Sequence, residues 1–232
     1  MLAVGTDDAR PAGWRDSLWF AAIELLLFIA VFEAGSYNYL PVSHTPWLFI
    51  LCWALLRVRG KRWRDVGLRL TASWPFTIAV GAVAGVALSV HELVVLEPLV
   101  RQWTGTPPDL SQFKELTGNL QTTLLIIAVS WVLAGFGEEM VWRGFAMTRV
   151  AEVLGGGAGA WLVSLVGVSV IFGIAHSYQE LSGVIITAIG GMTYGILYLL
   201  SGRSLAVPIV AHGAQNTCDF LLIYWGGIIP GT

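Results

Sequence analysis

Long apolar stretches alternate with short polar ones along the chain, and this pattern predicts membrane-spanning helices. The first stretch runs from Leu18 to about Gly35 and lacks a small-residue cleavage site, so we expect a retained helix rather than a signal peptide. An eighth helix is expected only if 57–70 or 109–120 forms a re-entrant or amphipathic piece. The other expected spans cover residues 45–57, 74–96, 121–150, 158–176, 183–200 and 205–225.

Composition supports an all-α, polytopic transmembrane bundle of seven or eight helices. The chain is 56% hydrophobic and 12% charged, whereas a soluble domain carries about 25% charged residues. No tandem repeat is visible, so residues 18–225 are expected to form one transmembrane domain after a polar segment, 1–17. Cys52 and Cys218 both lie in apolar runs, which favours small core residues over a disulfide.

The basic residues predict the orientation of the bundle. With the N-terminus in the cytoplasm, ten Lys and Arg residues fall on the cytoplasmic side and two, Arg101 and Lys114, on the far side, with Arg143 inside the membrane. Such a bias is the usual topogenic signal. The ten cytoplasmic residues are Arg10, Arg15, Arg57, Arg59, Lys61, Arg62, Arg64, Arg69, Arg149 and Arg203.

Two glycine pairs spaced by four predict close contacts between helices. Gly81 and Gly85 share one helix face, and so do Gly191 and Gly195. Small residues at this spacing allow two backbones to approach closely. We interpret both pairs as packing motifs.

The fourth expected span carries three charged residues that are costly at bilayer depth unless they are paired or face water. Glu139 and Arg143 are four residues apart, so they share a helix face and can pair. Glu138 points about 100° away from that face and lacks the partner. A free carboxylate in a dry pocket is suited to act as a general base on water. The alternative is a buried ion-pair network that only fixes helix packing.

Two later spans contribute further polar side chains. His176 ends the fifth span, four residues after Phe172, and either packs by a hydrogen bond or takes part in catalysis. Glu180 follows as a solvated loop charge or as a partner of that ring. His212 and Asn216 share a face of the last span and can donate two hydrogen bonds to one oxyanion. The same pair can equally hold two helices together.

The order Glu-Glu-x-x-x-Arg, Phe-x-x-x-His and His-x-x-x-Asn resembles the CPBP family of intramembrane proteases. This family includes the type II CAAX prenyl endopeptidases and the bacterial Abi group, linked to bacteriocin processing or self-immunity. The resemblance covers roughly residues 121–225. It implies an intramembrane endopeptidase, with 121–225 as the catalytic core.

The resemblance also implies a role for each residue of the first two motifs. Glu138 would activate water with help from His176, while Glu139 and Arg143 would hold and tune Glu138. Trp142 stands where many relatives carry Phe, which keeps an aromatic side chain before Arg143.

The last motif bears on whether a metal is needed. By the resemblance, His212 and Asn216 would form the oxyanion hole of a glutamate-based hydrolysis that requires no metal. This is our preferred interpretation, because Asn is a poor zinc ligand and a good oxyanion donor. A three-ligand zinc site on Glu138, His176 and His212 is the alternative.

The expected spans leave one conflict of depth. Glu138 and Asn216 fall near the middle of the bilayer, whereas His176 falls toward the far end of its helix. A single site therefore requires a fifth helix that is short, tilted or displaced.

Two other functional classes stay open at this stage. A non-catalytic immunity or scaffold protein would tolerate loss of Glu138. A proton-coupled transporter would also bury ionisable residues, although the internal symmetry common in transporters is not visible. Further ionisable residues available to a transporter are Glu24, Glu33, His91 and Glu92.

The resemblance and the hydropathy together define the expected partners. These are the lipid bilayer and a peptide or protein substrate in or at the membrane, either prenylated at its C-terminus or carrying a leader peptide. No nucleic-acid partner is expected. The expected location is the cell membrane of a bacterium or archaeon, with the N-terminus in the cytoplasm.

Overall fold

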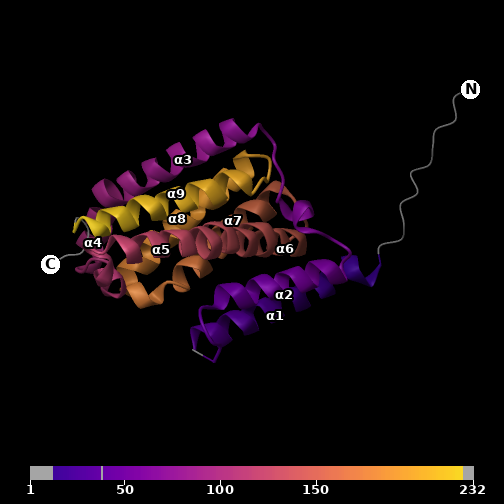
Figure 1. Ribbon diagram of the computed structural model, residues 1–232. Coiled ribbons are helices and arrows are strands. Elements are labelled where there is room, and N and C mark those ends of the chain that lie inside the picture. The colour runs from indigo at the N-terminus through magenta and orange to yellow at the C-terminus, as the bar shows by residue number, and fades with distance from the viewer. Residues whose placement is uncertain (1–12, 38, 227–232) are drawn as a thin grey trace, which may run out of the picture.

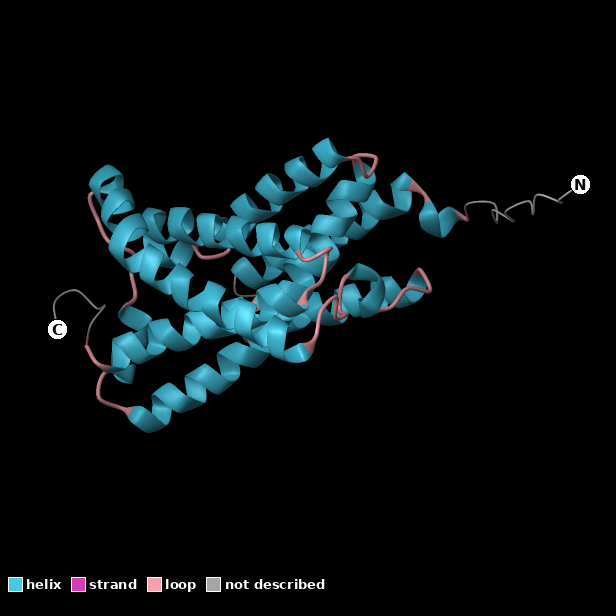
Figure 2. Ribbon diagram, turned by 90° about the horizontal axis from the view of Figure 1, so that it is seen from above, coloured by secondary structure: helices cyan, strands magenta, loops and turns pink. Residues whose placement is uncertain are grey.

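The computed structural model describes residues 13–37 and 39–226, and all regular structure in these two ranges is helical (Figures 1 and 2). Residues 1–12 of the predicted cytoplasmic segment, including Arg10, lie outside the described residues. The α-helices are α1 Leu18–Ser36, α2 His44–Val58, α3 Trp74–His91, α4 Glu97–Thr104, α5 Leu120–Ser130, α6 Met147–Val153, α7 Ala158–Ile174, α8 Glu180–Leu200 and α9 Ala206–Tyr224. The π and 3₁₀ elements are η1 Trp14–Asp16, η2 Trp63–Val66, η3 Glu92–Leu96, η4 Ser111–Leu116, η5 Trp131–Ala146 and η6 Ser177–Gln179.

The predicted bundle is confirmed, with corrections to individual elements. Helices α3, η3 and α4 run on as one stretch, Trp74–Thr104, which is longer than the predicted span. The stretch α5–η5–α6, Leu120–Val153, is likewise unbroken, as predicted. The two places considered for an eighth helix form short 3₁₀ turns, η2 and η4.

Several helices have the length and surface of membrane spans. Among the described helices, four are long and apolar enough to cross a bilayer, and α2 and α7 are shorter apolar helices. Large apolar side chains point outward from them; Leu26, Val83 and Leu162 are each more than 60% exposed. An outward apolar surface of this extent suits contact with lipid rather than water.

The helix that carries the charged motif is wound more widely than an α-helix. Over Trp131–Ala146 it is a π-helix, and the N–H of Met147 donates to the carbonyl of Trp142, five residues back. Trp142 lies at the centre of an aromatic core, with ring centroids 5.3 Å from Phe28 and 5.6 Å from Phe172. These contacts fix η5 against both α1 and α7.

Helices α3 and α9 pack closely along their length, as Figure 1 shows. A Cβ atom on Gly81 would lie 2.6 Å from Cβ of Val210, and one on Gly85 would lie 2.3 Å from the carbonyl oxygen of Ala211. The packing role predicted for this glycine pair is confirmed. The contact matters for the site because it holds α9 in place.

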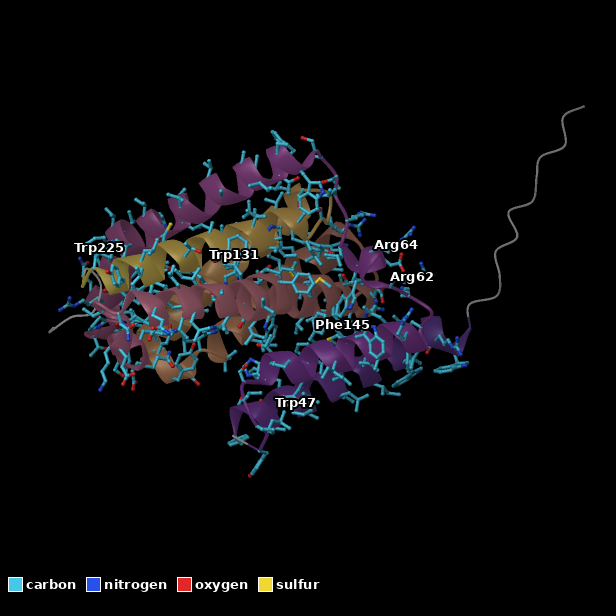
Figure 3. All side chains as sticks on the ribbon, viewed as in Figure 1. Trp47, Arg62, Arg64, Trp131, Phe145 and Trp225 are labelled. Atoms are coloured by element: carbon cyan, nitrogen blue, oxygen red, sulfur yellow. The ribbon has the colours of Figure 1, made fainter. Side chains whose placement is uncertain are left out.

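Most of the basic side chains gather at one end of the bundle, where Figure 3 shows Arg62 and Arg64, with Trp225 at the opposite end. The guanidinium of Arg69 donates to the carbonyl of Gly202, which joins two of the loops at this end. The predicted grouping of charges on one side is therefore present. Its orientation relative to the cytoplasm stays a prediction.

Two of these basic residues are buried instead of facing the membrane surface. Arg59 Nε donates to both carboxylate oxygens of Glu24 at 2.9 Å. Arg149 is fully buried, 3.9 Å from the same carboxylate, and also pairs with Glu152. These ion pairs join α1, α2 and α6, so Arg59 and Arg149 stabilise helix packing in addition to any topogenic role.

The predicted core role of the cysteines is confirmed for Cys52, which is fully buried. Cys218 is only partly buried, and both thiols are free.

Candidate active site

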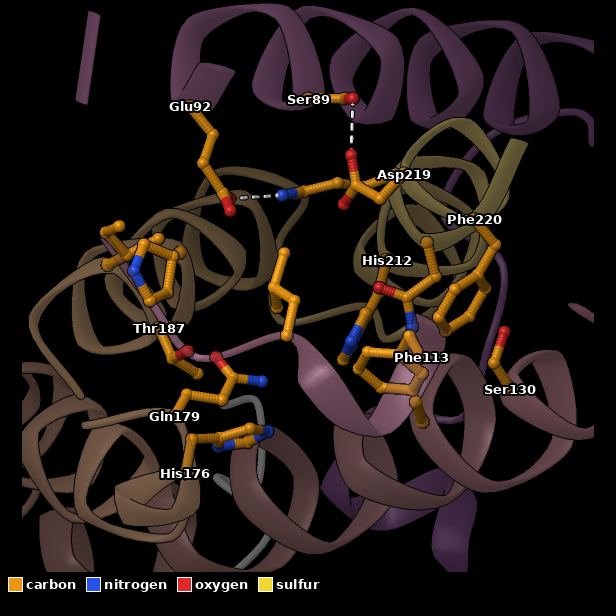
Figure 4. Close-up of a pocket in the computed structure, with 18 of the residues that line it drawn as sticks. Ser89, Glu92, Phe113, Ser130, His176, Gln179, Thr187, His212, Asp219 and Phe220 are labelled. Atoms are coloured by element: carbon orange, nitrogen blue, oxygen red, sulfur yellow. Dashed lines mark hydrogen bonds between the residues drawn. The ribbon is translucent and has the colours of Figure 1, made fainter. Parts of the chain in front are cut away.

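A cavity of about 260 Å³ lies between η5, α8 and α9 and contains most of the predicted site residues. Glu138, His176, His212 and Asn216 all line it, and Figure 4 shows His176 and His212 among its walls. The segment between α4 and α5 lies over the cavity and contributes Phe113 to its lining. The structure thus brings three separate sequence motifs to one place.

Glu139 does not line the cavity but forms a buried cluster behind it. Its Oε1 lies 2.9 Å from Arg143 Nη1 and 2.8 Å from His212 Nδ1, and its side chain is fully buried. The predicted pairing of Glu139 with Arg143 is confirmed. The bond to His212 adds a link from η5 to α9 that the sequence did not predict.

Gly191 of α8 completes this cluster. Arg143 Nη2 donates to the carbonyl of Gly191 at 2.8 Å. A Cβ atom on Gly191 would lie 2.7 Å from the Phe172 ring and 3.0 Å from Arg143 Nη2. Gly191 therefore gives the guanidinium room to reach the helix backbone, beyond the simple packing role predicted for it.

Glu138 has surroundings opposite to those of its neighbour. Its side chain is half-buried and lines the cavity. Within residues 13–37 and 39–226, no hydrogen bond or ion pair joins its carboxylate to another side chain. One carboxylate of the pair is thus neutralised, and the other is free to meet a water molecule or a substrate.

His176 reaches the cavity because α7 is short and ends at Ile174. Its Nδ1 lies 2.9 Å from the carbonyl oxygen of Phe172. A carbonyl only accepts, so Nδ1 carries the proton and Nε2 of the neutral ring is left as an acceptor. Glu180 is exposed and does not bond this ring, but it is the first residue of α8 and not a loop residue as expected. Despite the different depths expected from the spans, His176 lines the same cavity as Glu138 and Asn216.

The contact with Glu139 also fixes the proton on His212. An ionised carboxylate only accepts hydrogen bonds, so His212 Nδ1 must donate. Nε2 can then donate toward the cavity only when the ring is an imidazolium. Asn216 lies one turn further along α9, and in the described part of the chain its amide forms no side-chain hydrogen bond.

The alternative zinc site does not fit this arrangement. Among the described residues, no three His, Cys, Asp or Glu side chains converge closely enough to hold a metal ion, and that includes Glu138, His176 and His212. We therefore derive no catalytic step through a metal.

Several polar residues of the cavity were missed from the sequence. Gln215 of α9 donates from Nε2 to Glu92 at 2.8 Å, and Ser89 donates to Asp219 at 2.5 Å (Figure 4). Tyr194 of α8 lies in the same wall and donates to Gln215. The sequence did hold a signal for two of them: Gln215 lies three residues after His212, and Tyr194 lies three residues after Gly191, so each shares a helix face with a residue already selected.

The residues considered for a transporter lie in different surroundings. Glu24 is paired at the basic end, whereas Glu33 and His91 are exposed on helix surfaces. Glu92 alone lines the cavity. These four side chains do not form one continuous path across the bundle.

The comparisons with known proteins bear on the same segment. Residues 120–218 match the family model for Type II CAAX prenyl endopeptidase Rce1-like proteins. These residues, called the CAAX protease segment below, are similar to that family and make up less than half of the chain. No curated protein and no solved structure matches significantly. The apolar helices, together with this similarity, indicate an integral membrane protein.

The CAAX protease segment contains all six residues selected from the motifs, while part of the cavity comes from outside it. Glu92 precedes this segment and Asp219 follows it. His44, at the start of α2, also lies near enough to interact electrostatically with Glu138 and His176. The helices before residue 120 thus contribute to the surroundings of this cavity.

Proposed function

We propose that this protein is an intramembrane endopeptidase in which Glu138 activates water for the hydrolysis of a peptide bond. The observation that carries the proposal is the contrast between the two adjacent carboxylates. Glu139 is fully buried and bonded to Arg143 and His212, whereas Glu138 faces the cavity without such a partner. General-base catalysis needs a carboxylate that can take a proton from water.

In the proposed reaction Glu138 removes a proton from water, and the resulting hydroxide attacks the carbonyl carbon of the peptide bond. The carbonyl oxygen becomes an oxyanion. When the C–N bond breaks, Glu138 returns the proton to the leaving amine, so that one water molecule is consumed and one carboxylic acid and one amine are formed. His176 assists by accepting a hydrogen bond from the water through Nε2.

The oxyanion is held by His212 and Asn216 in this mechanism. Two donors aimed at the developing charge stabilise the transition state more than the ground state. His212 donates from Nε2 when its ring carries both protons, with Nδ1–H held by Glu139 at 2.8 Å. Glu139 and Arg143 act indirectly, by holding His212 and the helix that carries Glu138.

We further propose a CAAX-type substrate, a protein with a prenylated C-terminus that is cleaved at the membrane. The support is the family match over residues 120–218. The proposed orientation has the N-terminus in the cytoplasm of a bacterial or archaeal cell. The reason is that the basic residues gather at the end of the bundle where α1 begins (Figure 3).

The test is cleavage of defined peptides by the purified protein in detergent or vesicles. The panel contains prenylated C-terminal peptides, the same peptides without the prenyl group, and leader peptides, each incubated with wild type and Glu138→Gln. We expect cleavage of the prenylated peptides by wild type only. Cleavage of leader peptides alone would overturn the substrate assignment, and cleavage of none would overturn the enzyme.

A further inference from the structure

We propose that Tyr194, Gln215 and Glu92 form a positioning relay that fixes the plane of the His212 ring. The inference rests on the proposed function for its catalytic consequence, but the geometry of the relay stands independently. It starts at Glu92, which lies outside the CAAX protease segment, and ends at a proposed oxyanion donor.

The first contact of the relay is a stacked pair of rings. The Tyr194 and His212 rings have centroids 4.5 Å apart and planes inclined by 17°. Tyr194 is 4% exposed, so its ring has little room to move. The Phe172 ring meets His212 edge-on at 6.4 Å from another direction. His212 is therefore held by a flat aromatic contact in addition to its bond with Glu139.

The second contact fixes the orientation of the Tyr194 ring. Its hydroxyl donates to Gln215 Oε1 at 2.6 Å, and Gln215 Nε2 donates to Glu92 Oε2 at 2.8 Å. The amide nitrogen of Gln215 thus faces Glu92, and its oxygen accepts from the Tyr194 hydroxyl. Each donor in this chain of hydrogen bonds has an acceptor, and buried polar networks of this kind rigidify the groups they join.

The relay joins three separate elements, η3, α8 and α9. Gln215 and His212 are three residues apart on α9, so a shift of one moves the other. Removing the Tyr194 hydroxyl keeps the buried ring but removes the hydrogen bond that sets its angle against the His212 ring. The proposed result is a misaligned His212 and weaker oxyanion stabilisation, with substrate binding unchanged.

A matched control lies one turn along the same helix. Tyr198 is 1% exposed, and its hydroxyl donates to the carbonyl of Val66 at 3.1 Å. Tyr198→Phe and Tyr194→Phe therefore each remove one buried tyrosine hydroxyl from α8. Only Tyr194 touches His212.

The direct test is the NMR signal of His212 in protein labelled at its four histidines, with the signal assigned by its loss in His212→Gln. We expect Tyr194→Phe and Glu92→Met to shift this signal. Glu92→Gln keeps an acceptor for Gln215 and should leave it in place, as should Tyr198→Phe. A His212 signal that Tyr194→Phe and Glu92→Met leave unmoved would overturn the relay, whether or not the protein cleaves peptides.

The kinetic test applies once wild type is shown to cleave a peptide. Tyr194→Phe should lower kcat by roughly three- to tenfold, the range expected for one hydrogen bond, with KM unchanged. Glu92→Met should do the same, and the double variant should lose no more than either single one, because both break one chain of bonds. Equal kcat in Tyr194→Phe and Tyr198→Phe would contradict the relay while leaving the proposed protease intact.

Discussion

Glu139 Oε1 lies 2.8 Å from His212 Nδ1, which joins the second carboxylate of the Glu-Glu pair to a helix 73 residues further along the chain. The same oxygen also accepts from Arg143. One buried carboxylate thus neutralises a guanidinium and fixes an imidazole, and this leaves Glu138 as the carboxylate that faces the cavity. The predictions below rest on these different roles of the two adjacent glutamates.

Breaking the buried pair should reduce both stability and activity. Arg143→Ala strands the carboxylate of Glu139, and Glu139→Gln strands the guanidinium, at a cost of about 3–5 kcal/mol in the free energy of unfolding. Denaturant unfolding in detergent measures this change. The control is Arg64→Ala, whose pair with Asp65 is exposed and 3.9 Å long. Loss of a surface pair should cost at most about 1 kcal/mol. Equal stability of Arg143→Ala and Arg64→Ala would contradict the buried cluster.

Loss of one oxyanion donor should affect turnover more than binding. Asn216→Ala should lower kcat by roughly 10²–10³-fold with little change in KM. Asn216→Asp keeps the size of the side chain but cannot donate, so it should be no better. Cys218→Ala, a partly buried change on the same helix, serves as the control and should match wild type. An Asn216→Ala variant within a factor of about two of wild type would rule out this donor.

The glutamate mechanism requires no bound metal, whereas a zinc site would. We expect protein treated with a strong chelator to keep its activity and to contain no stoichiometric metal by elemental analysis. Loss of activity on chelation that zinc restores, together with loss of bound zinc in His176→Gln, would overturn the metal-free mechanism.

The sequence predicted those features that depend on local spacing. Glu139 and Arg143 lie four residues apart on one helix, and their contact followed from helical geometry alone. The spans followed from hydropathy, and their largest error was the stretch 74–104, because its polar end at Glu97–Thr104 continues the helix beyond the apolar run.

The remaining features depend on packing between helices that are distant in sequence. Nothing in the spacing of α9 specifies that His212 meets Glu139, or that Gln215 meets Glu92. The burial of Arg149 beside Glu24 was missed for the same reason, because a basic residue near the end of a span is usually a surface charge. The position of His176 required the end of α7, which the hydropathy placed two residues too late.

The orientation of the bundle is open to a labelling test. Ala72 and Gln102 are exposed near opposite ends of the stretch α3–η3–α4 and can each be changed to Cys in a Cys218→Ala background, since Cys52 is buried. With the N-terminus in the cytoplasm, a membrane-impermeant maleimide should label Gln102→Cys in intact cells, and Ala72→Cys only after lysis. The reverse pattern would invert the orientation.

The central claim is tested most directly by Glu138→Gln, which removes the base and keeps the shape of the side chain. The measurement is peptide hydrolysis by purified Glu138→Gln, with its unfolding transition recorded in the same detergent. We predict no detectable product and a transition like that of wild type, because Glu138 has no partner to lose among the described residues. Hydrolysis at the wild-type rate by the folded variant would contradict the account.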